Sequence, residues 1–522
     1  MPETPPPFVP FASDNYAGTH PEVLAAVMAA NEGFAVAYGD DPWTARLGTR
    51  VEEVFGAGAR AFPVVNGTGA NVVSLMALSE RWGGVVTSDV AHVNTDENGA
   101  PERVGGLKML PCPSDDGRIA PFHVERWARQ RHDVHRAHPG VLSLTQSTEL
   151  GTVYSLDALR DLVDTAHGLG MAVHLDGSRL ANAAVALGCS LRALTTDVGI
   201  DVVSLGAAKI GGMLGEAVVV LGPDAAPSFP GSGYDGAASR RGAAAAVPYV
   251  RKATMQLASK ARFVSAQLLA LLGDPGEPVH DGAPSWAGSG AGGFGSGSGD
   301  AGFGAAVGSS PPAADSRETL DVALGGHAGL AVGPPLWHRT AVHANAMAAR
   351  LHAGLADAGL IAAGPVGSDD APGHLDTTAS GGAEVLQADG RRTDDTEDLQ
   401  TGSRRVDSTG VPQAGSRRVD STGVPQAGSR RTDGAADAGV QPAGAAPSYP
   451  VRITRPVEAN AVFATLPRGA ADRLRVRSRF YDWGPGETPD RVEARWMCSW
   501  DTPPEAVDAF VAALAADLHG TH

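Results

Sequence analysis

Short apolar runs alternate with amphipathic segments between residues 60 and 222. Each run is continuous rather than interrupted by polar residues, which is typical of strands covered on both faces, as in a parallel sheet between helices. The pattern therefore predicts an α/β fold with a mostly parallel central sheet flanked by helices. The predicted strands are 62–65, 84–87, 141–145, 171–175, 202–205 and 217–221.

The amphipathic segments carry the signals of helix ends. Ser155 is a suitable N-cap, apolar residues follow at helical spacing to Ala166, and Gly168 supplies a stop. Near the start of the chain, Thr19 and Glu22 form a capping-box pattern that opens a helix through Ala30. We also predict helices over 72–81, 253–272, 336–360 and 504–518.

After residue 450 the pattern changes to a few strands followed by one helix. The apolar runs 451–454, 461–466 and 494–500 predict strands, and the segment from Pro504 to Leu518 is amphipathic. This combination indicates a small α+β domain at the C-terminal end of the sequence.

Two insertions break the pattern, because their composition cannot bury enough apolar surface to offset the entropy lost on ordering. One is rich in Gly, Ser, Ala and Pro, and the other contains a tandem repeat in which 402–414 recurs identically through Ala427. We predict disorder in both. The repeats fit either an arginine-containing interaction tether or a repeat expansion tolerated in a surface loop. The predicted organisation is an N-terminal segment with a large domain over 1–273, insertions at 274–334 and 364–448, a connecting helix over 335–363, and a small domain over 449–522.

Charge and cysteine content limit the partners and the compartment. The 522 residues carry a formal net charge of −17, from 41 basic and 58 acidic residues, and a surface of that sign repels nucleic acid and anionic lipid. Cys112, Cys189 and Cys498 are far apart and have no CxxC spacing, which favours reduced thiols over a disulfide frame or a metal site. The first residues lack the pattern of a secretory leader, and no apolar stretch approaches the roughly 20 residues of a membrane span. We expect a cytoplasmic protein that binds no metal, nucleic acid or membrane.

Lys209 stands alone between two apolar runs in the segment 201–221, beside the glycines at 211 and 212. A lysine among small uncharged residues, partly removed from water, loses some of its preference for the ammonium form, and the free amine can then attack an aldehyde. The same segment also fits an ordinary surface lysine at a strand-to-strand turn. The segment alone does not distinguish an imine-forming lysine from an ordinary surface lysine, so other parts of the chain are needed.

Three further places at predicted strand ends carry candidate chemistry. Residues 66–71, Asn-Gly-Thr-Gly-Ala-Asn, follow a strand and open a helix, which fits a bound phosphate or a plain strand-helix turn. Asp176 follows a buried run, where ligands bind in open α/β sheets. It either pairs with Arg179 or binds a protonated ring nitrogen, which leaves Arg179 for a substrate carboxylate. His92 follows another strand, and its ring fits a structural role, stacking on a flat cofactor, or proton transfer.

Taken in chain order, these features resemble the fold-type-I pyridoxal-phosphate enzymes and, within them, the low-specificity L-threonine aldolases of the β-eliminating lyase group. The resemblance covers about residues 9–273, 335–362 and 450–520, and fails only in the two insertions. It rests on Ser13-Asp-Asn15, Tyr38-Gly-Asp-Asp-Pro42, Gly67-Thr68 with Asn71, His92 with Asp96 and Glu97, His174-Leu-Asp-Gly-Ser-Arg179, the Lys209 segment, Gln256 to Phe263, Pro456-Val-Glu-Ala-Asn460 and Arg495-Trp-Met-Cys-Ser499.

The resemblance implies pyridoxal 5'-phosphate as the cofactor and a role for each matching position. Lys209 would hold the cofactor through an imine, Asp176 would keep its pyridine nitrogen protonated, and His92 would stack on its ring. The phosphate would be bound by Gly67 and Thr68. The carboxylate of the substrate would be held, and its Cα–Cβ bond oriented, by Ser13, Arg179 and Arg495.

One position departs from the family pattern. Several members have a histidine where this chain has Glu149, in the segment 146–151. The base that takes the proton of the substrate's β-hydroxyl is therefore Glu149, His92 or a bound water. Our hypothesis is that Glu149 contributes, because the retro-aldol step needs a proton acceptor near that hydroxyl.

The activity that the resemblance implies is cleavage of L-threonine or L-allo-threonine to glycine and acetaldehyde, by a homodimer or homotetramer with active sites near its subunit contacts. Two alternatives stay open. One is a pyridoxal-phosphate lyase of the same fold that acts on another amino acid by β-elimination. The other is a catalytically silent homologue used as a scaffold, whose repeats bind a partner.

Overall fold

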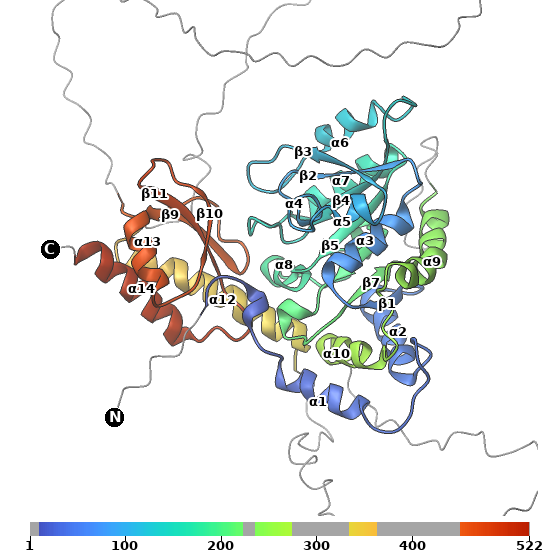
Figure 1. The fold of residues 1–522 in the computed structure, drawn as a ribbon, viewed down its shortest axis with the longest axis horizontal. Helices are drawn as coiled ribbons and strands as arrows, with labels where there is room; N and C mark the ends of the chain where they lie inside the picture. Colours follow the sequence, from blue (N-terminus) through green and yellow to red (C-terminus); the bar gives the residue numbers. More distant parts are fainter. Residues whose placement is uncertain (1–9, 223–234, 274–332, 363–448, 521–522) are drawn as a thin grey trace, which may run out of the picture. The chain divides into compact units, whose positions relative to one another are not determined.

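The computed structural model describes residues 10–222, 235–273, 333–362 and 449–520 (Figure 1). All of these residues belong to one compact unit of the chain. The predictions of disorder concern 274–334 and 364–448, and all of these residues except 333 and 334 lie outside the described residues.

A seven-stranded sheet forms the large domain, in the order β1-β7-β6-β5-β4-β2-β3. Strands β3, β2, β4, β5 and β6 run parallel to one another, and β7 runs antiparallel to both β6 and β1. The prediction of a mostly parallel sheet is confirmed. The strands are β1 (Arg60–Val64), β2 (Gly83–Ser88), β3 (Lys108–Cys112), β4 (His138–Thr145), β5 (Ala172–Gly177), β6 (Val202–Leu205) and β7 (Glu216–Val220).

Alternate side chains of these strands enter two cores, which explains why the apolar runs are continuous. Val202 and Val218 pack on one face with α3 (Gly67–Leu78) and α9 (Gly236–Ala253). Val203 on the other face packs with a second set of helices, α2 (Pro42–Phe55), α7 (Leu156–Gly168), α8 (Leu180–Leu187) and α10 (Arg262–Leu272). The shorter elements of this domain are η1 (Asp14–Tyr16), α1 (Pro21–Ala30), α4 (His92–Thr95), α5 (Ala100–Arg103), α6 (Pro121–Ala128), η2 (Thr196–Val198) and η3 (Ala208–Ile210).

Two predicted helix starts are wrong, because a neighbouring side chain makes the cap. Helix α3 begins at Gly67 rather than at residue 72, since Asn66 Oδ1 accepts a hydrogen bond from the Gly69 N–H at 2.7 Å. Helix α1 is capped by His20 and not by Thr19, and the imidazole Nδ1 accepts from the Glu22 N–H at 3.2 Å. Both corrections move a boundary without changing the type of element.

The single helix predicted over 253–272 is also wrong. Helix α9 ends at Ala253, and α10 begins only at Arg262. The residues between them are not helical, and Met255 has a φ of 62°. This break brings the side-chain Oε1 of Gln256 to the backbone N–H of Val65, 3.0 Å away, at the entrance to α3.

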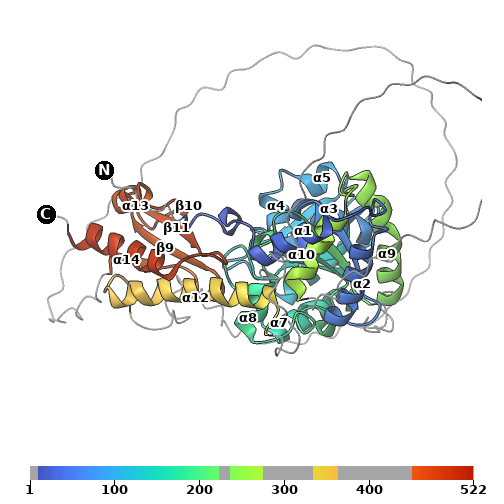
Figure 2. The ribbon, with the colours of Figure 1, turned by 90° about the horizontal axis from the view of Figure 1, so that it is seen from below.

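The small domain contains an antiparallel sheet in the order β10-β11-β9-β8, which confirms the predicted α+β class. Helices α12 and α14 lie side by side against it (Figure 2), and their side chains share one core with Trp496. The sequence pattern does not predict α13 or β10, and the strand predicted over 494–500 runs earlier, over 491–497. The elements are α12 (Leu336–Asp357), β8 (Arg452–Ile453), β9 (Ala461–Pro467), α13 (Arg468–Arg475), β10 (Tyr481–Pro485), β11 (Arg491–Met497) and α14 (Pro504–His519).

The segment before η1 joins the small domain. The Phe11 N–H donates to Arg479 O and the Met497 N–H donates to Phe11 O, each at 2.8 Å. The Phe11 ring is buried with its centroid 4.6 Å from that of Phe510. Within the described part of the chain, the search for a helix of membrane-spanning length and hydropathy finds none.

Candidate active site

Lys209 lies in η3, in the turn that connects β6 with β7, as the strand pattern predicts. It is partly buried, and burial lowers the pKa of its amine, with the positive charge of Arg179 adding to the effect. The carboxylates of Asp14, Asp176 and Glu216 act in the opposite direction. The surroundings therefore increase the share of the neutral, nucleophilic amine.

Glu216, which sequence reasoning misses, supports the turn that carries Lys209. It opens β7, is buried, and accepts a short hydrogen bond from the backbone N–H of Ala207. Burial raises the pKa of this carboxyl to about 7. An acid at the head of the apolar run Glu216-Ala-Val-Val-Val is the signal that could have identified it.

Asp176 lies in β5, at the carboxyl end of the parallel strands, and is buried. Burial alone would raise the pKa of its carboxyl, but hydrogen bonds from Ser178 and the charge of Lys209 hold this pKa below its usual value. Ser178 donates from Oγ at 2.6 Å and from its backbone N–H at 3.0 Å. The Asp176 carboxyl is thus kept as a carboxylate.

A hydrogen-bonded chain connects His92 with Asp176. His92 Nδ1 lies 2.9 Å from Glu97 Oε1, and Asn71 Nδ2 donates to that oxygen at 2.8 Å and to Asp176 Oδ2 at 2.9 Å. The hydrogen bond with Glu97 raises the pKa of His92, against the effect of burial. The sequence indicates Asn71 and Glu97 only as parts of a motif, whereas in the structure these two residues connect His92 with Asp176 through hydrogen bonds.

The turn predicted to bind phosphate opens α3, so the N–H groups of Gly67 and Thr68 belong to a helix N-terminus. Gly69 has no room for a side chain, since a Cβ at this position would lie 2.0 Å from the Gln256 side chain. The Gln256 side chain would therefore have to move to admit a larger residue at this first turn of α3.

Arg179 pairs with Asp14 and not with Asp176. Its Nε lies 2.7 Å from Asp14 Oδ2 and its Nη2 lies 3.0 Å from Oδ1, while Asn460 Nδ2 donates to the same Oδ2 at 3.2 Å. The two-point contact fixes the plane of the Arg179 guanidinium.

The other two residues predicted to hold a carboxylate come from distant segments. Arg495 in β11 donates from Nη2 to Ala12 O at 3.2 Å and stacks 4.6 Å from the Trp483 ring centre. Burial, and then the charge of Arg179, lower the pKa of Arg495 to about 10. Ser13 precedes η1, and its Oγ accepts from the Asn15 N–H at 3.2 Å. Two guanidinium groups that repel each other form a favourable place for an anion.

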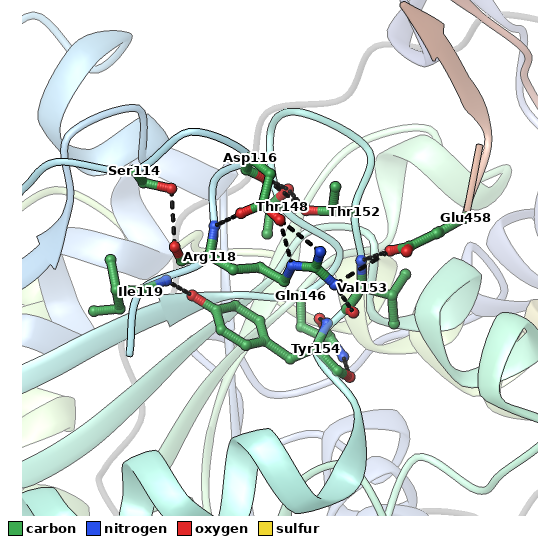
Figure 3. A network of polar contacts seen from close by, with 10 residues as sticks. All are labelled: Ser114, Asp116, Arg118, Ile119, Gln146, Thr148, Thr152, Val153, Tyr154 and Glu458. Atoms are coloured by element: carbon green, nitrogen blue, oxygen red, sulfur yellow. Dashed lines mark hydrogen bonds and ion pairs between the residues drawn. The ribbon is translucent and has the colours of Figure 1, made fainter. Parts of the chain in front are cut away.

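Glu149 lies in the loop that follows β4. Its Oε1 accepts from the backbone N–H of His92 at 2.7 Å, and its Oε2 is buried without a hydrogen bond of normal geometry. Burial, with Asp176 as a second cause, raises the pKa of this carboxyl. Figure 3 shows the polar network that holds the far side of the same loop, where Arg118 and Glu458 meet the backbone of Val153.

The described residues contain no group of three His, Cys, Asp or Glu side chains arranged to hold a metal ion. The free cysteines 112 and 498 are buried, and Cys189 is partly buried. The polar side chains that gather around Lys209 therefore define the candidate site.

Comparison with known sequences assigns the chain to a family. The family model described as "Beta-eliminating lyase" matches residues 10–464. Two relatives named low specificity L-threonine aldolase, from Pseudomonas sp. (strain NCIMB 10558) and Pseudomonas aeruginosa, are each 40% identical over 265 residues, or 51% of this chain and 71% of the relative.

Comparison with solved structures agrees on the fold. A threonine aldolase from Leishmania major matches with a TM-score of 0.60 at 18% identity, over 97% of this chain and 98% of that chain. A serine palmitoyltransferase from Sphingomonas wittichii matches with a TM-score of 0.50 at 12% identity, over 98% of this chain and 88% of that chain. The chain belongs to the beta-eliminating lyase family and has the fold of the fold-type-I enzymes.

Proposed function

We propose that this protein is a pyridoxal-phosphate-dependent aldehyde-lyase that cleaves L-threonine, L-allo-threonine or a related L-β-hydroxy-α-amino acid to glycine and an aldehyde such as acetaldehyde. The names of the Pseudomonas relatives support this activity. The family match spans the candidate site residues from Ser13 to Lys209. The observation that carries the proposal is that the Lys209 amine is partly buried and interacts electrostatically with the Asp176 carboxylate. Asp176 lies at the carboxyl end of the parallel strands, where ligands bind in such sheets.

The residues around Lys209 fit pyridoxal phosphate. Asn71 Oδ1, Glu97 Oε2 and Arg495 Nε are buried and have no hydrogen-bond partner within the described residues, which is the pattern of a site that completes its contacts with a bound molecule. The N-terminus of α3 supplies N–H groups for a phosphate. When bound, the cofactor withdraws electrons from the substrate's Cα, which is the chemistry that breaking the Cα–Cβ bond needs.

Each cofactor contact has a physical reason. Lys209 would bind the aldehyde carbon through its neutral amine, and Gly67 and Thr68 would bind the phosphate. Asp176, whose lowered pKa keeps it ionised, would hold a proton on the pyridine nitrogen. His92, fixed by Glu97 and with its side chain 40% exposed, would stack on the ring.

Ser13, Arg179 and Arg495 would bind the substrate carboxylate. Asp14 fixes the orientation of Arg179 through Nε and Nη2, and the carboxylate would relieve the repulsion between the two guanidinium groups. A carboxylate anchored in this way orients the Cα–Cβ bond relative to the cofactor ring.

Glu149 would accept the proton of the β-hydroxyl. Its Oε2 is buried and has no hydrogen-bond donor of normal geometry, and burial raises the pKa of this carboxyl, which favours its taking up a proton. We expect Glu149→Gln to lower the cleavage rate with little change in KM. A full rate across the pH profile in this variant would remove Glu149 from the reaction.

The visible spectrum of the purified protein tests the cofactor. We expect an absorption band that borohydride reduces in wild type and that Lys209→Ala lacks. Product analysis then tests the reaction, because glycine with an aldehyde supports the aldolase, whereas ammonia with a keto acid would replace it with β-elimination. Deletion of 364–448 tests the scaffold alternative, since an aldolase keeps its activity without the repeats.

We further propose a cytoplasmic homodimer or homotetramer. Large apolar side chains exposed on several elements support an assembled state. These are Met28, Phe34, Val36, Met213, Leu214, Tyr249 and Met255. Light scattering of the purified protein gives the mass, and Phe34→Asp should shift it toward the monomer if this surface is a subunit contact.

A further inference from the structure

The loop from Gln146 to Tyr154, which carries Glu149, is closed by hydrogen bonds between its own two sides. The Gln146 side chain donates to Tyr154 O at 2.9 Å and accepts from the Tyr154 N–H at 3.0 Å. The Thr148 N–H donates to Thr152 O at 2.9 Å, and their hydroxyls lie 2.7 Å apart. These hydrogen bonds tie the two sides of the loop together. The contacts between the loop and the rest of the protein therefore set the position of Glu149.

Val153 is one of the residues through which the loop is held (Figure 3). Its backbone N–H donates to Glu458 Oε2 at 2.6 Å, and its carbonyl accepts from Arg118 Nη1 at 3.2 Å. Arg118 and Glu458 form an ion pair at 3.7 Å, and Asp116 orients the guanidinium through contacts of 2.8 Å to Nε and 2.5 Å to Nη2. Both backbone polar groups of Val153 are thus held by one ion pair.

Glu458 comes from the small domain, in a sequence 309 positions after Glu149. The other hydrogen bonds that hold the loop, such as that from the Thr152 hydroxyl to Asp116 O at 2.7 Å, stay within the large domain, while Leu150 packs on Ala461, Phe463 and Met497 of the small domain. A groove of about 940 Å³ runs beside the contact, and the Arg118 and Glu458 side chains are one-third exposed in it. Either side chain can therefore be substituted without creating a cavity in a hydrophobic core.

We propose that Glu458, together with Arg118, is a positioning residue that holds the Glu149 carboxylate at its working distance from the substrate. The proposal rests on the proposed function, in which Glu149 is the proton acceptor. Glu458 touches neither substrate nor cofactor and acts through the Val153 peptide. A displacement of the acceptor by a fraction of an ångström changes proton transfer without changing how the carboxylate of the substrate is bound.

A double-mutant cycle on the holoenzyme tests this. We expect Glu458→Ala to lower kcat by about tenfold with KM within a factor of two. Glu458→Gln keeps an acceptor for the Val153 N–H and should recover most of the rate. In the Glu149→Gln background, Glu458→Ala should cost nothing further, because its effect passes through Glu149. An equal loss in both backgrounds would overturn the proposal.

Glu487 supplies the matched control. It is also a small-domain glutamate about one-third exposed, and it pairs with Arg491 at 3.1 Å and accepts from the Thr465 hydroxyl at 2.6 Å. Glu487→Ala should leave kcat unchanged, and a loss equal to that of Glu458→Ala would assign the effect to general loosening of the small domain.

Hydrogen exchange separates a failure of this proposal from a failure of the proposed function. Glu458→Ala should accelerate exchange of the amides of 146–154, and Glu487→Ala should not, whatever reaction the protein catalyses. Unchanged exchange in Glu458→Ala would overturn the positioning role. A wild type that releases no glycine from threonine would overturn the proposed function and leave the exchange result intact.

Discussion

A buried ion pair and the candidate active site differ in how completely their polar atoms are paired. In the first, Asp201 Oδ1 receives Arg240 Nε at 2.9 Å, and Oδ2 receives the Val173 N–H at 2.8 Å and lies 3.0 Å from His167 Nε2. The other nitrogens of Arg240 donate to Gly222 O and Gly199 O. In the second, around Lys209, Asn71, Glu97, Glu149 and Arg495 each keep one buried atom without a partner.

The difference separates a structural role from a functional one. A buried charge that is fully hydrogen-bonded joins strands and helices without needing a ligand, whereas an unpaired buried atom costs stability that only a bound molecule can return. The group around Lys209 also contains the carboxyls with raised pKa, Glu149 and Glu216. Incomplete pairing together with displaced pKa values is what distinguishes an active site from a buried ion pair.

The largest expected effect is the loss of stability when the buried ion pair between Asp201 and Arg240 is broken. Arg240→Met leaves the Asp201 carboxylate buried with one partner fewer, and we expect the free energy of unfolding to fall by about 3 to 5 kcal/mol. Urea titration measures this. The adjacent Arg241 is exposed, and Arg241→Met serves as the control. Equal urea midpoints for the two variants would mean that Asp201 does not depend on its arginine.

A smaller effect, with a pH dependence, is expected at Glu216. Its folded pKa of about 7 exceeds the ordinary 4.5, so the folded protein keeps a proton that the unfolded chain loses, and stability falls as the pH rises through this window. In the cofactor-free protein, Glu216→Gln should match wild type near pH 4.5 and exceed it at pH 8 by on the order of 2 kcal/mol. A constant difference between the two pH values would contradict the assignment.

Glu149→Gln should separate stability from activity. Replacing a buried, incompletely paired carboxylate by a neutral amide should raise the free energy of unfolding at neutral pH by about 1 kcal/mol, while cleavage slows. Paired measurements of thermal unfolding and glycine release check both. A lower free energy of unfolding for Glu149→Gln than for wild type would show that the unpaired Oε2 of Glu149 does not destabilise the fold.

The smallest effect is expected for an exposed pair. Arg350 Nη2 lies 2.6 Å from Asp508 Oδ2 between α12 and α14, with both side chains about half exposed. Because solvent screens such pairs, Arg350→Ala should leave the urea midpoint unchanged within error. A clearly lower urea midpoint for Arg350→Ala would mean that this exposed pair contributes to stability as a buried pair does.

The sequence predicts those parts of the fold and site that depend on local pattern. Continuous apolar runs locate the strands, and Asp176 and Lys209 are predicted as site residues because each comes shortly after the end of one. The break at Gln256 is not predicted, and the contact that accompanies it is with Val65, which is distant in sequence. The pairing of Arg179 with Asp14 is missed for the same reason, because helical and strand periodicity carry no information about which distant carboxylate an arginine meets.

The two ends of the candidate site become complete at different times during synthesis. Asp176, Asn71, Glu97 and Lys209 all precede residue 217, so the cofactor end is available once the large domain has formed. Asn460, which contacts Asp14 across 446 positions, and Met497, which binds Phe11, are made near the end. Since domains fold as the chain emerges from its N-terminus, we expect a nascent chain to form the place proposed for the cofactor well before the place proposed for the substrate.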